Sequence, residues 1–315
     1  MQKANIVFMG TPDFAVPSLE LLATHHNILL VVTTPDKPAG RGLKIQYSPI
    51  KTKALELQLP VSQPVLLKDP DFINQIKNIN PDFIIVVAFR IIPDEIFKIP
   101  KLGTINLHPS LLPKYRGPSP IQWAIINGEN QTGVTTIFLN EKIDSGPILL
   151  QETEPIYDND NFLTLHNRLK IKGAKLLLET INGVIDNTIT PKMQDNLVKQ
   201  NNLYAPKITK EMTKLDLSRS CVYNWRVIRA LYPKPAAYIY LVDDNKKKIL
   251  KILEADYDLR ISNPGDFTLL DKHNFAIGCS DGILIPKTVA LEGRKVMTSS
   301  EFLRGMHFSK IMHFE

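Results

Sequence analysis

The sequence predicts an α/β fold: a Rossmann-like open, mostly parallel sheet with helices on both faces, followed by a C-terminal OB-like β-barrel. Short apolar runs alternate with amphipathic stretches over the first half of the chain, which is typical of strands and helices in a parallel sheet. The near-continuous apolar run at 83–88 suits a strand buried on both faces. Five short strand candidates separated by turn residues occupy the last third and favour a small barrel.

The elements of the first half follow from the spacing of apolar residues. The helix at 50–57 is expected directly behind Ser48-Pro49. The helix from about 161 is expected to have Asp158 or Asp160 as its cap and to break at Gly183. Strands are expected at 6–9, 28–32, 83–88, 104–107, 134–139 and 148–150, and helices at 14–23, 50–57 and about 161–182.

A polar segment that contains two prolines follows and is typical of an extended linker. Beyond it, the expected elements are a helix at 218–231, strands at 237–242, 249–255, 267–270, 275–279 and 283–289, and a terminal helix at 300–306. The domain prediction is therefore a catalytic domain over 1–188, a linker over 189–206 and a C-terminal OB-like domain over 207–315.

Length and cysteine content narrow the class of protein. A chain of 315 residues fits two domains of ordinary size. No apolar run of about eighteen residues occurs, and a strand-like run begins shortly after Met1, so we expect no membrane segment, no signal peptide and a cytoplasmic protein. Cys221 and Cys279 lack the spacing of a metal site, which predicts reduced, buried thiols and no metal.

The net charge of +6 is concentrated at one end of the chain. Residues 207–315 hold 18 Lys and Arg against 13 Asp and Glu, and therefore carry +5 of the +6. A basic C-terminal part favours a polyanionic partner, although many proteins reach such values without one.

The segment from 106 to 147 concentrates polar side chains in a frame of glycine and proline. Asn106 and His108 come at the end of a predicted strand, and that edge of an open α/β sheet is where ligands bind. If an amine attacks a one-carbon acyl group, Asn106 can donate to the oxyanion. His108 can accept the amine proton when neutral or donate to the oxyanion when protonated, and the sequence leaves both roles open. Asp144 can orient the imidazole and favour its charged form.

Taken singly, these three residues could be ordinary turn or surface residues. Together, Asn106-Leu107-His108-Pro109-Ser110-Leu111-Leu112-Pro113 and Asp144-Ser145-Gly146 resemble the catalytic signature of the folate-dependent formyltransferases. The resemblance extends from Ile6 to about Leu303 and is closest to members that act on tRNA. It implies 10-formyltetrahydrofolate as donor, the α-amino group of methionine on initiator tRNA as acceptor, and direct transfer without a covalent enzyme intermediate. It assigns the catalytic roles to Asn106, His108 and Asp144.

The resemblance also implies a folate pocket between the end of the strand at 83–88 and the catalytic loop. Phe89-Arg90 replaces the Tyr-Gly of many members, so main-chain contacts are expected to matter more than these two side chains. Arg90 could reach the glutamate carboxylates of folate or be a solvated loop arginine. The folate-binding candidates are Val87, Ala88, Phe89, Arg90, Ile91, Ser110, Leu111, Leu112 and Pro113. Phe14 is a candidate wall of the methionine pocket or, equally, a core residue at a helix start.

Two segments are implied to bind tRNA. The first is the long loop at 34–44, which presents Arg41 between two glycines, with Lys37 and Lys44 beside it. Its alternative is a mobile surface loop. The second is the basic C-terminal part, where Lys207 and Lys210 are the candidates and the run at 246–248 is either a solvated turn or a binding patch. We expect initiator methionyl-tRNA as partner, no membrane association, and a monomer.

A nicotinamide cofactor is not expected, because the first turn has only Gly10 and no GxGxxG, and no acidic residue ends the second strand. One rival hypothesis keeps the chemistry but takes an amino-sugar nucleotide as acceptor. Another is a basic RNA-binding protein whose catalytic residues are vestigial. An assay of formyl transfer separates all three.

Overall fold

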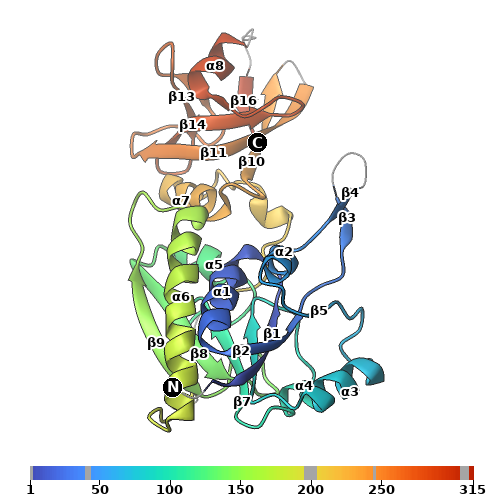
Figure 1. Cartoon of the computed structure of the whole chain (residues 1–315). Helices are drawn as coiled ribbons and strands as arrows, with labels where there is room; N and C mark the ends of the chain where they lie inside the picture. Colours follow the sequence, from blue (N-terminus) through green and yellow to red (C-terminus); the bar gives the residue numbers. More distant parts are fainter. Residues whose placement is uncertain (1–2, 40–43, 195–203, 244–245, 306–311) are drawn as a thin grey trace. The chain divides into compact units, whose positions relative to one another are not determined.

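A seven-stranded sheet in the order β5-β2-β1-β6-β7-β8-β9 is the frame of the first part of the chain (Figure 1). The strands from β5 to β7 are parallel, whereas β8 is antiparallel to β7 and to β9. The mostly parallel sheet predicted from the sequence is confirmed. Its strands are β1 (Asn5–Gly10), β2 (Asn27–Val32), β5 (Val61–Ser62), β6 (Phe83–Val87), β7 (Gly103–His108), β8 (Gln131–Phe138) and β9 (Ile148–Pro155).

This computed structural model describes the whole chain except residues 1–2, 40–43, 195–203, 244–245 and 306–311. The chain divides into two compact units. Unit 1 comprises 1–120, 131–155 and 166–205, and unit 2 comprises 121–130, 156–165 and 206–315. The domain limits predicted from the sequence stay a prediction.

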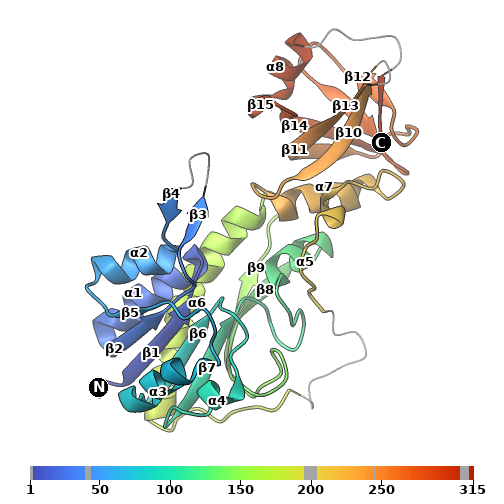
Figure 2. The ribbon, with the colours of Figure 1, turned by 90° about the vertical axis from the view of Figure 1, so that its right-hand side faces the viewer.

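Helices cover both faces of the sheet in unit 1 (Figure 2). On one face, apolar side chains of α3 and α4 pack with Val7, Ile84 and Val86. On the other face lies α6, where Gly173 approaches Leu107 so closely that a Cβ would be 2.8 Å from its Cδ2. The helices of this unit are η1 (Asp13–Ala15), α1 (Val16–His25), α2 (Pro49–Glu56), α3 (Pro70–Ile79), α4 (Asp94–Phe97) and most of α6 (Phe162–Ile185).

Capping residues mark the ends of two helices in unit 1. The Ser48 side chain accepts from the backbone N–H of Lys51, as the predicted start of α2 requires. The helix α3 was not among the elements expected from the sequence, although Asp69 caps it and Asn80 ends it in the left-handed conformation. Both residues were signals available in the sequence.

The predicted start of α6 at about 161 is confirmed, whereas its predicted cap and its predicted C-terminal end were wrong. Asn161, and neither of the two predicted aspartates, caps the helix, because its Oδ1 accepts from the N–H of Thr164 at 3.1 Å. The helix continues through Gly183 to Ile185. A Cβ on Gly183 would lie 2.6 Å from Ile189 Cδ1, so this glycine makes room for the chain that follows the helix.

Unit 2 contains an antiparallel sheet in the order β12-β13-β14-β11-β10-β16, with β15 paired to β14. The sheet is nearly closed, because Asp266 next to β12 forms a bridge with His313 of β16. Phe275, Phe302 and Phe314 pack ring against ring inside it. The OB-like barrel is therefore confirmed. The strands are β10 (Ala237–Asp243), β11 (Lys246–Asp258), β12 (Phe267–Leu269), β13 (Phe275–Gly278), β14 (Ile283–Leu291), β15 (Met297–Thr298) and β16 (Met312–Phe314).

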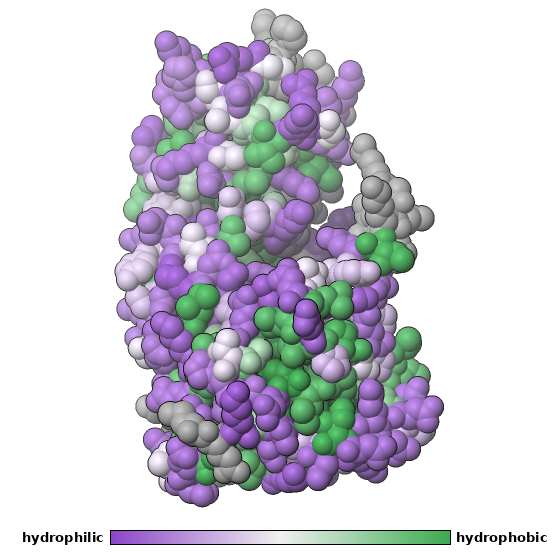
Figure 3. Space-filling model, viewed as in Figure 1, coloured by the Kyte–Doolittle hydropathy of each residue, from purple (hydrophilic) through white to green (hydrophobic). Residues whose placement is uncertain are grey.

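The remaining elements of unit 2 are α5 (Pro120–Ile126), η3 (Glu211–Thr213), α7 (Cys221–Leu231) and α8 (Ser299–Arg304). A capping box of Thr298 and Glu301 begins α8, and the Ser220 side chain caps α7. Hydrophilic side chains dominate the face of this unit shown in Figure 3. Within the described residues, no helix is long and apolar enough to span a bilayer.

Candidate active site

The predicted catalytic residues come from β7 and from the turn between β8 and β9. Asn106 and His108 are two residues apart on β7, so they point to the same face of the sheet. Asn106 pairs with Val86 of β6 and Ile137 of β8, which places it within the sheet. Its carboxamide has no hydrogen-bond partner among the described residues. The amide is therefore available to a ligand.

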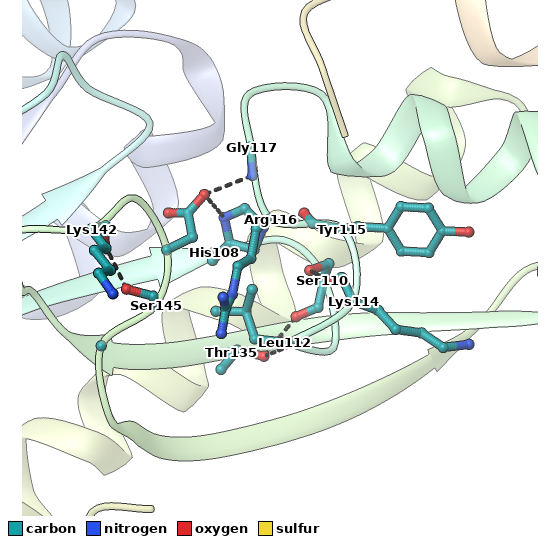
Figure 4. Close-up of polar contacts among 12 residues, drawn as sticks. His108, Ser110, Leu112, Lys114, Tyr115, Arg116, Gly117, Thr135, Lys142 and Ser145 are labelled. Atoms are coloured by element: carbon teal, nitrogen blue, oxygen red, sulfur yellow. Dashed lines mark hydrogen bonds and ion pairs between the residues drawn. The ribbon is translucent and has the colours of Figure 1, made fainter. Parts of the chain in front are cut away.

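His108 lies between two oxygen atoms (Figure 4). Its side chain is 6% exposed, and Nδ1 is 3.6 Å from Asp144 Oδ2. Its Nε2 lies 2.9 Å from the carbonyl oxygen of Tyr115. Because a carbonyl oxygen only accepts, Nε2 must carry a proton for this hydrogen bond to form. A neutral imidazole can donate to one of the two oxygens, whereas an imidazolium can donate towards both.

Asp144 is held in a tight turn beside His108. Its φ of 49° is in the left-handed region, which side-chain-bearing residues seldom adopt. Its Oδ2 accepts from the N–H of Gly117 at 2.8 Å. Two residues later, a Cβ on Gly146 would lie 1.7 Å from the carbonyl oxygen of Phe138, so only glycine fits there. The predicted triad is brought together by this turn and the end of β7.

The loop after His108 is fastened to β8 by side chains that the sequence motifs did not single out. Thr135 Oγ1 donates to the carbonyl of Ser110 at 2.6 Å and accepts from the N–H of Leu112 at 3.2 Å (Figure 4). Gln151 donates to the carbonyl of Leu112 at 2.8 Å and to Thr135 at 2.9 Å. The Leu112–Pro113 peptide within this loop is cis. These contacts give the catalytic loop one conformation.

The folate-binding candidates differ in what they expose. Ala88 is exposed at a φ of 48°, and Ile91 is 78% exposed. Val87, Ser110 and Leu112 are buried, and Ser110 Oγ donates to the carbonyl of Lys114 at 2.7 Å. Those three side chains point into the protein, so these residues could meet a ligand only through their main chain, and their role in folate binding stays a prediction. Phe89, Leu111 and Pro113 are half-buried.

The guanidinium of Arg90 is bound to two main-chain carbonyls, and its role towards folate stays a prediction. Its Nη1 donates to the carbonyl of Val65 at 2.9 Å, and its Nη2 donates to the carbonyl of Pro64 at 2.9 Å. Desolvation by burial lowers the pKa of its guanidinium from the usual value. Arg90 thus joins the loop after β6 to the loop after β5, a role that neither of the two hypotheses for this residue included.

Phe14 lies in the interior of unit 1. It is 4% exposed, and its ring meets His166 edge-on with 5.2 Å between ring centroids. Burial lowers the pKa of His166, against the opposing effect of Asp13. This packing favours the core interpretation of Phe14, and its role in a methionine pocket stays a prediction.

The long loop of unit 1 begins and ends on a short hairpin of β3 (Lys37–Ala39) and β4 (Lys44–Gln46). Arg41 lies outside the described residues. Lys37 is exposed, and Lys44 belongs to β4 by its main chain. At the base of the hairpin, Gln63 donates to Asp36 Oδ1 and to the carbonyl of Thr34, both at 2.8 Å.

The basic side chains of unit 2 divide into exposed ones and ones bound to the main chain. Lys207 and Lys210 are exposed. Arg229 instead donates to the carbonyls of Asp160 and Tyr157, at 2.5 and 2.7 Å, and burial lowers its pKa. The lysines at 246–248 begin β11 and all three are exposed, and residues 244–245 of the expected turn lie outside the described part.

No cluster of three or more His, Cys, Asp or Glu side chains suited to a metal ion occurs in the part of the chain that the structure describes. Gln194, which no sequence motif singled out, is fully buried beside Asp144. It lies in the segment predicted to be a linker, where a polar residue carries no signal of burial.

Comparisons with known proteins agree with this geometry. Residues 4–181 match the family model described as formyl transferase, and residues 207–307 match that of the formyl transferase C-terminal domain. The chain is 45% identical over 312 residues to a methionyl-tRNA formyltransferase of Thermodesulfovibrio yellowstonii, covering 98% of each chain. It is 42% identical over 310 residues to one of Bacteroides thetaiotaomicron, covering 97% of this chain and 96% of the relative.

Solved structures share the fold at lower identity. An N-formyltransferase of Helicobacter canadensis in complex with folinic acid and dTDP-3-aminofucose superposes with a TM-score of 0.66 at 22% identity. That likeness covers 89% of this chain and 97% of the other. HypX of Aquifex aeolicus in complex with tetrahydrofolic acid has a TM-score of 0.64 at 19% identity, over 100% of this chain and 51% of that one.

Proposed function

The chain belongs to the formyl transferase family, and we propose that it transfers a formyl group from 10-formyltetrahydrofolate to the α-amino group of methionine on initiator tRNA. The observation that carries this proposal is the combination of an intact Asn106, His108 and Asp144 at one sheet edge with similarity to methionyl-tRNA formyltransferases over nearly the whole length. Those relatives cover both the catalytic and the C-terminal family regions.

The reaction balances without any other reagent. The amine nitrogen attacks the formyl carbon, whose carbonyl oxygen becomes an oxyanion in a tetrahedral intermediate. The bond from that carbon to N10 of the folate then breaks, and the oxyanion returns to a carbonyl. One proton leaves the attacking nitrogen, and one is gained by the departing N10, so the net change is a formyl group exchanged for a proton.

Two side chains can stabilise the oxyanion. The Asn106 carboxamide has no partner among the described residues and can donate to it. His108 Nε2–H, which donates to the Tyr115 carbonyl in this structure, can turn towards the oxyanion. The same nitrogen, once it has given up its proton, can accept one from the amine. Asp144 faces Nδ1 of the His108 imidazole and can balance the positive charge of an imidazolium that forms during the reaction.

The exposed residues after β6 support a folate site beside Asn106. Ala88 and Ile91 offer main-chain groups and apolar surface at the end of the strand next to β7. Arg90 stabilises the conformation of that loop through its two backbone contacts. The main chain around Ala88 can therefore bind the flat, hydrogen-bonding pterin ring, as the resemblance implies.

The acceptor side is proposed to use basic side chains. Lys37, Lys207 and Lys210 are exposed and can meet phosphate, and Arg41 of the long loop is proposed to dock the acceptor end. Because each phosphate contact releases counterions, binding of tRNA should weaken steeply with salt. We propose that the protein acts as a monomer.

The test is transfer of labelled formyl from 10-formyltetrahydrofolate to initiator methionyl-tRNA, beside elongator methionyl-tRNA and an amino-sugar nucleotide. Label on initiator tRNA alone is the expected result. Label on the sugar alone would keep the chemistry and overturn the acceptor. Retention of tRNA without transfer would leave only an RNA-binding protein.

A further inference from the structure

We propose that Gln194 is a positioning residue for formyl transfer, which holds the turn that carries Asp144 against the catalytic loop. This inference rests on the proposed function. Gln194 touches neither His108 nor Asn106 in the structure, and its contacts are with the main chain around Asp144 and with Arg116. It would therefore act through Asp144.

Both ends of the Gln194 carboxamide are engaged. The residue is 0% exposed, and its Nε2 donates to the carbonyls of Asp144 and Gly146, at 2.9 and 2.7 Å. Its Oε1 accepts from Nε and Nη2 of Arg116, at 3.0 and 2.6 Å. Two carbonyls on one side need a donor, and a guanidinium on the other side needs an acceptor. A carboxamide is the side-chain group that supplies both.

These contacts complete a ring that includes the catalytic carboxylate. Gln194 binds the main chain of Asp144, and Asp144 Oδ2 accepts from the N–H of Gly117 at 2.8 Å. Gly117 is covalently joined to Arg116, which returns to Gln194. Asp144 Oδ2, which is part of this ring, lies 3.6 Å from His108 Nδ1. Loosening Gln194 should therefore loosen the contact that orients His108.

Backbone hydrogen bonds join the segment that contains Gln194 to β9 and to Arg116. Two residues earlier, Lys192 exchanges two backbone hydrogen bonds of 2.8 Å with Ile148 at the start of β9. Later in the same segment, the N–H of Ala205 donates to the carbonyl of Arg116 at 2.8 Å. The described residues of 189–205 thus belong to unit 1, and the two bonds of Lys192 hold the chain two residues before Gln194.

Two substitutions separate the two ends of the carboxamide. Gln194→Met keeps the approximate length and removes both hydrogen-bonding functions. Gln194→Glu keeps acceptors for Arg116 but places a carboxylate against the carbonyls of Asp144 and Gly146. We expect both variants to lower kcat by about 10- to 100-fold, because a misplacement of about 1 Å in a catalytic group has effects of that order. The KM values for folate and tRNA should stay within about threefold.

A matched control measures the effect of losing a buried hydrogen bond that does not involve the turn at Asp144. Thr180 is also 0% exposed; its Oγ1 donates to the carbonyl of Leu176 at 2.7 Å within α6 and lies 2.8 Å from Oγ1 of Thr136, which faces the side of β8 opposite Thr135. Thr180→Val should lower the Tm and leave kcat of the folded enzyme unchanged. The amide of Gly117 should exchange with deuterium faster in Gln194→Met than in the parent or in Thr180→Val.

The deciding measurement is a double-mutant cycle with Asp144→Ala. If Gln194 acts through Asp144, Gln194→Met should lower kcat no further in that background. Equal losses in both backgrounds, or a kcat loss matched by Thr180→Val, would overturn the inference. The parent enzyme is assayed first, so a failure of the proposed function appears as absent transfer by the parent and is not confused with a failure at Gln194.

Discussion

Gly146→Ala is the substitution whose effect follows most directly from the geometry of the site. An alanine Cβ would lie 1.7 Å from the carbonyl oxygen of Phe138, whereas real Cβ contacts essentially never fall below 3.0 Å. The turn at Gly146 and the end of β8 must therefore separate locally by about 1.3 Å, the difference between those distances. The atom in the way belongs to the backbone of β8, so no side-chain rotation can relieve the clash.

The displaced backbone is the turn that positions Asp144. Because Gly146 is two residues from Asp144, we expect the carboxylate to move by roughly 1 Å, and kcat to fall by about 100-fold. Overpacking of this kind should also lower the free energy of unfolding by about 1–3 kcal/mol. Formyl transfer under saturating substrates and thermal unfolding measure the two effects separately.

Gly305→Ala is the matched control. Its Cβ would meet Arg294 Nη1 at 3.1 Å, the end of a flexible side chain that can move aside. We expect kcat to stay at the parent value. A Gly146→Ala enzyme with kcat within threefold of the parent would refute the link between this turn and the catalytic carboxylate.

Three further predictions concern the catalytic pair, a buried histidine and the thiols. His108→Ala or Asp144→Ala should lower kcat at least 100-fold while the Kd for tRNA, measured by filter retention, stays within threefold; near-normal turnover would remove that residue from the mechanism. Burial, followed by the nearby positive charges, lowers the pKa of His26 from its usual value of 6.5. The folded state then binds fewer protons than the unfolded state, so stability present above about pH 6.5 is lost as the pH falls, by at most about 1.4 kcal/mol per pH unit. Urea unfolding at several pH values gives the free energy of unfolding as a function of pH. This free energy should depend less steeply on pH in His26→Gln than in the parent, and an unchanged pH dependence would contradict the reasoning. Burial raises the pKa of Cys221 to about 11 and that of Cys279 to about 12, so both thiols should react with iodoacetamide at pH 8 only after unfolding; rapid labelling of the native protein would be the opposing result.

Much of the fold was predictable because its signals are local. The strand at 83–88 was identified from its apolar run and is β6, and the helix predicted behind Ser48 is α2. The errors had different origins. The helix α3 was missed although Asp69 and Asn80 were local signals. The predicted end of α6 was too early, because the helix continues through Gly183, where Ile189 fills the space beside the glycine.

The candidate site shows the same division more sharply. The motif chemistry was enough to single out Asn106, His108 and Asp144, because residue type and position at a strand end are both properties of the local sequence. The inward orientation of Ser110 was not predictable. Its hydroxyl donates to the carbonyl of Lys114, four residues later, and its carbonyl accepts from the hydroxyl of Thr135 on β8.

The sequence by itself determined the two-part α/β and β-barrel architecture and singled out the proposed catalytic groups. Periodicity and motif spacing encode those features within short windows of the chain. Only the tertiary structure decided that Arg90 joins two loops and that Gln194 closes a ring around Asp144. Those partners are far apart in sequence, and a polar side chain shows its role only when folding has buried it beside the groups that it binds.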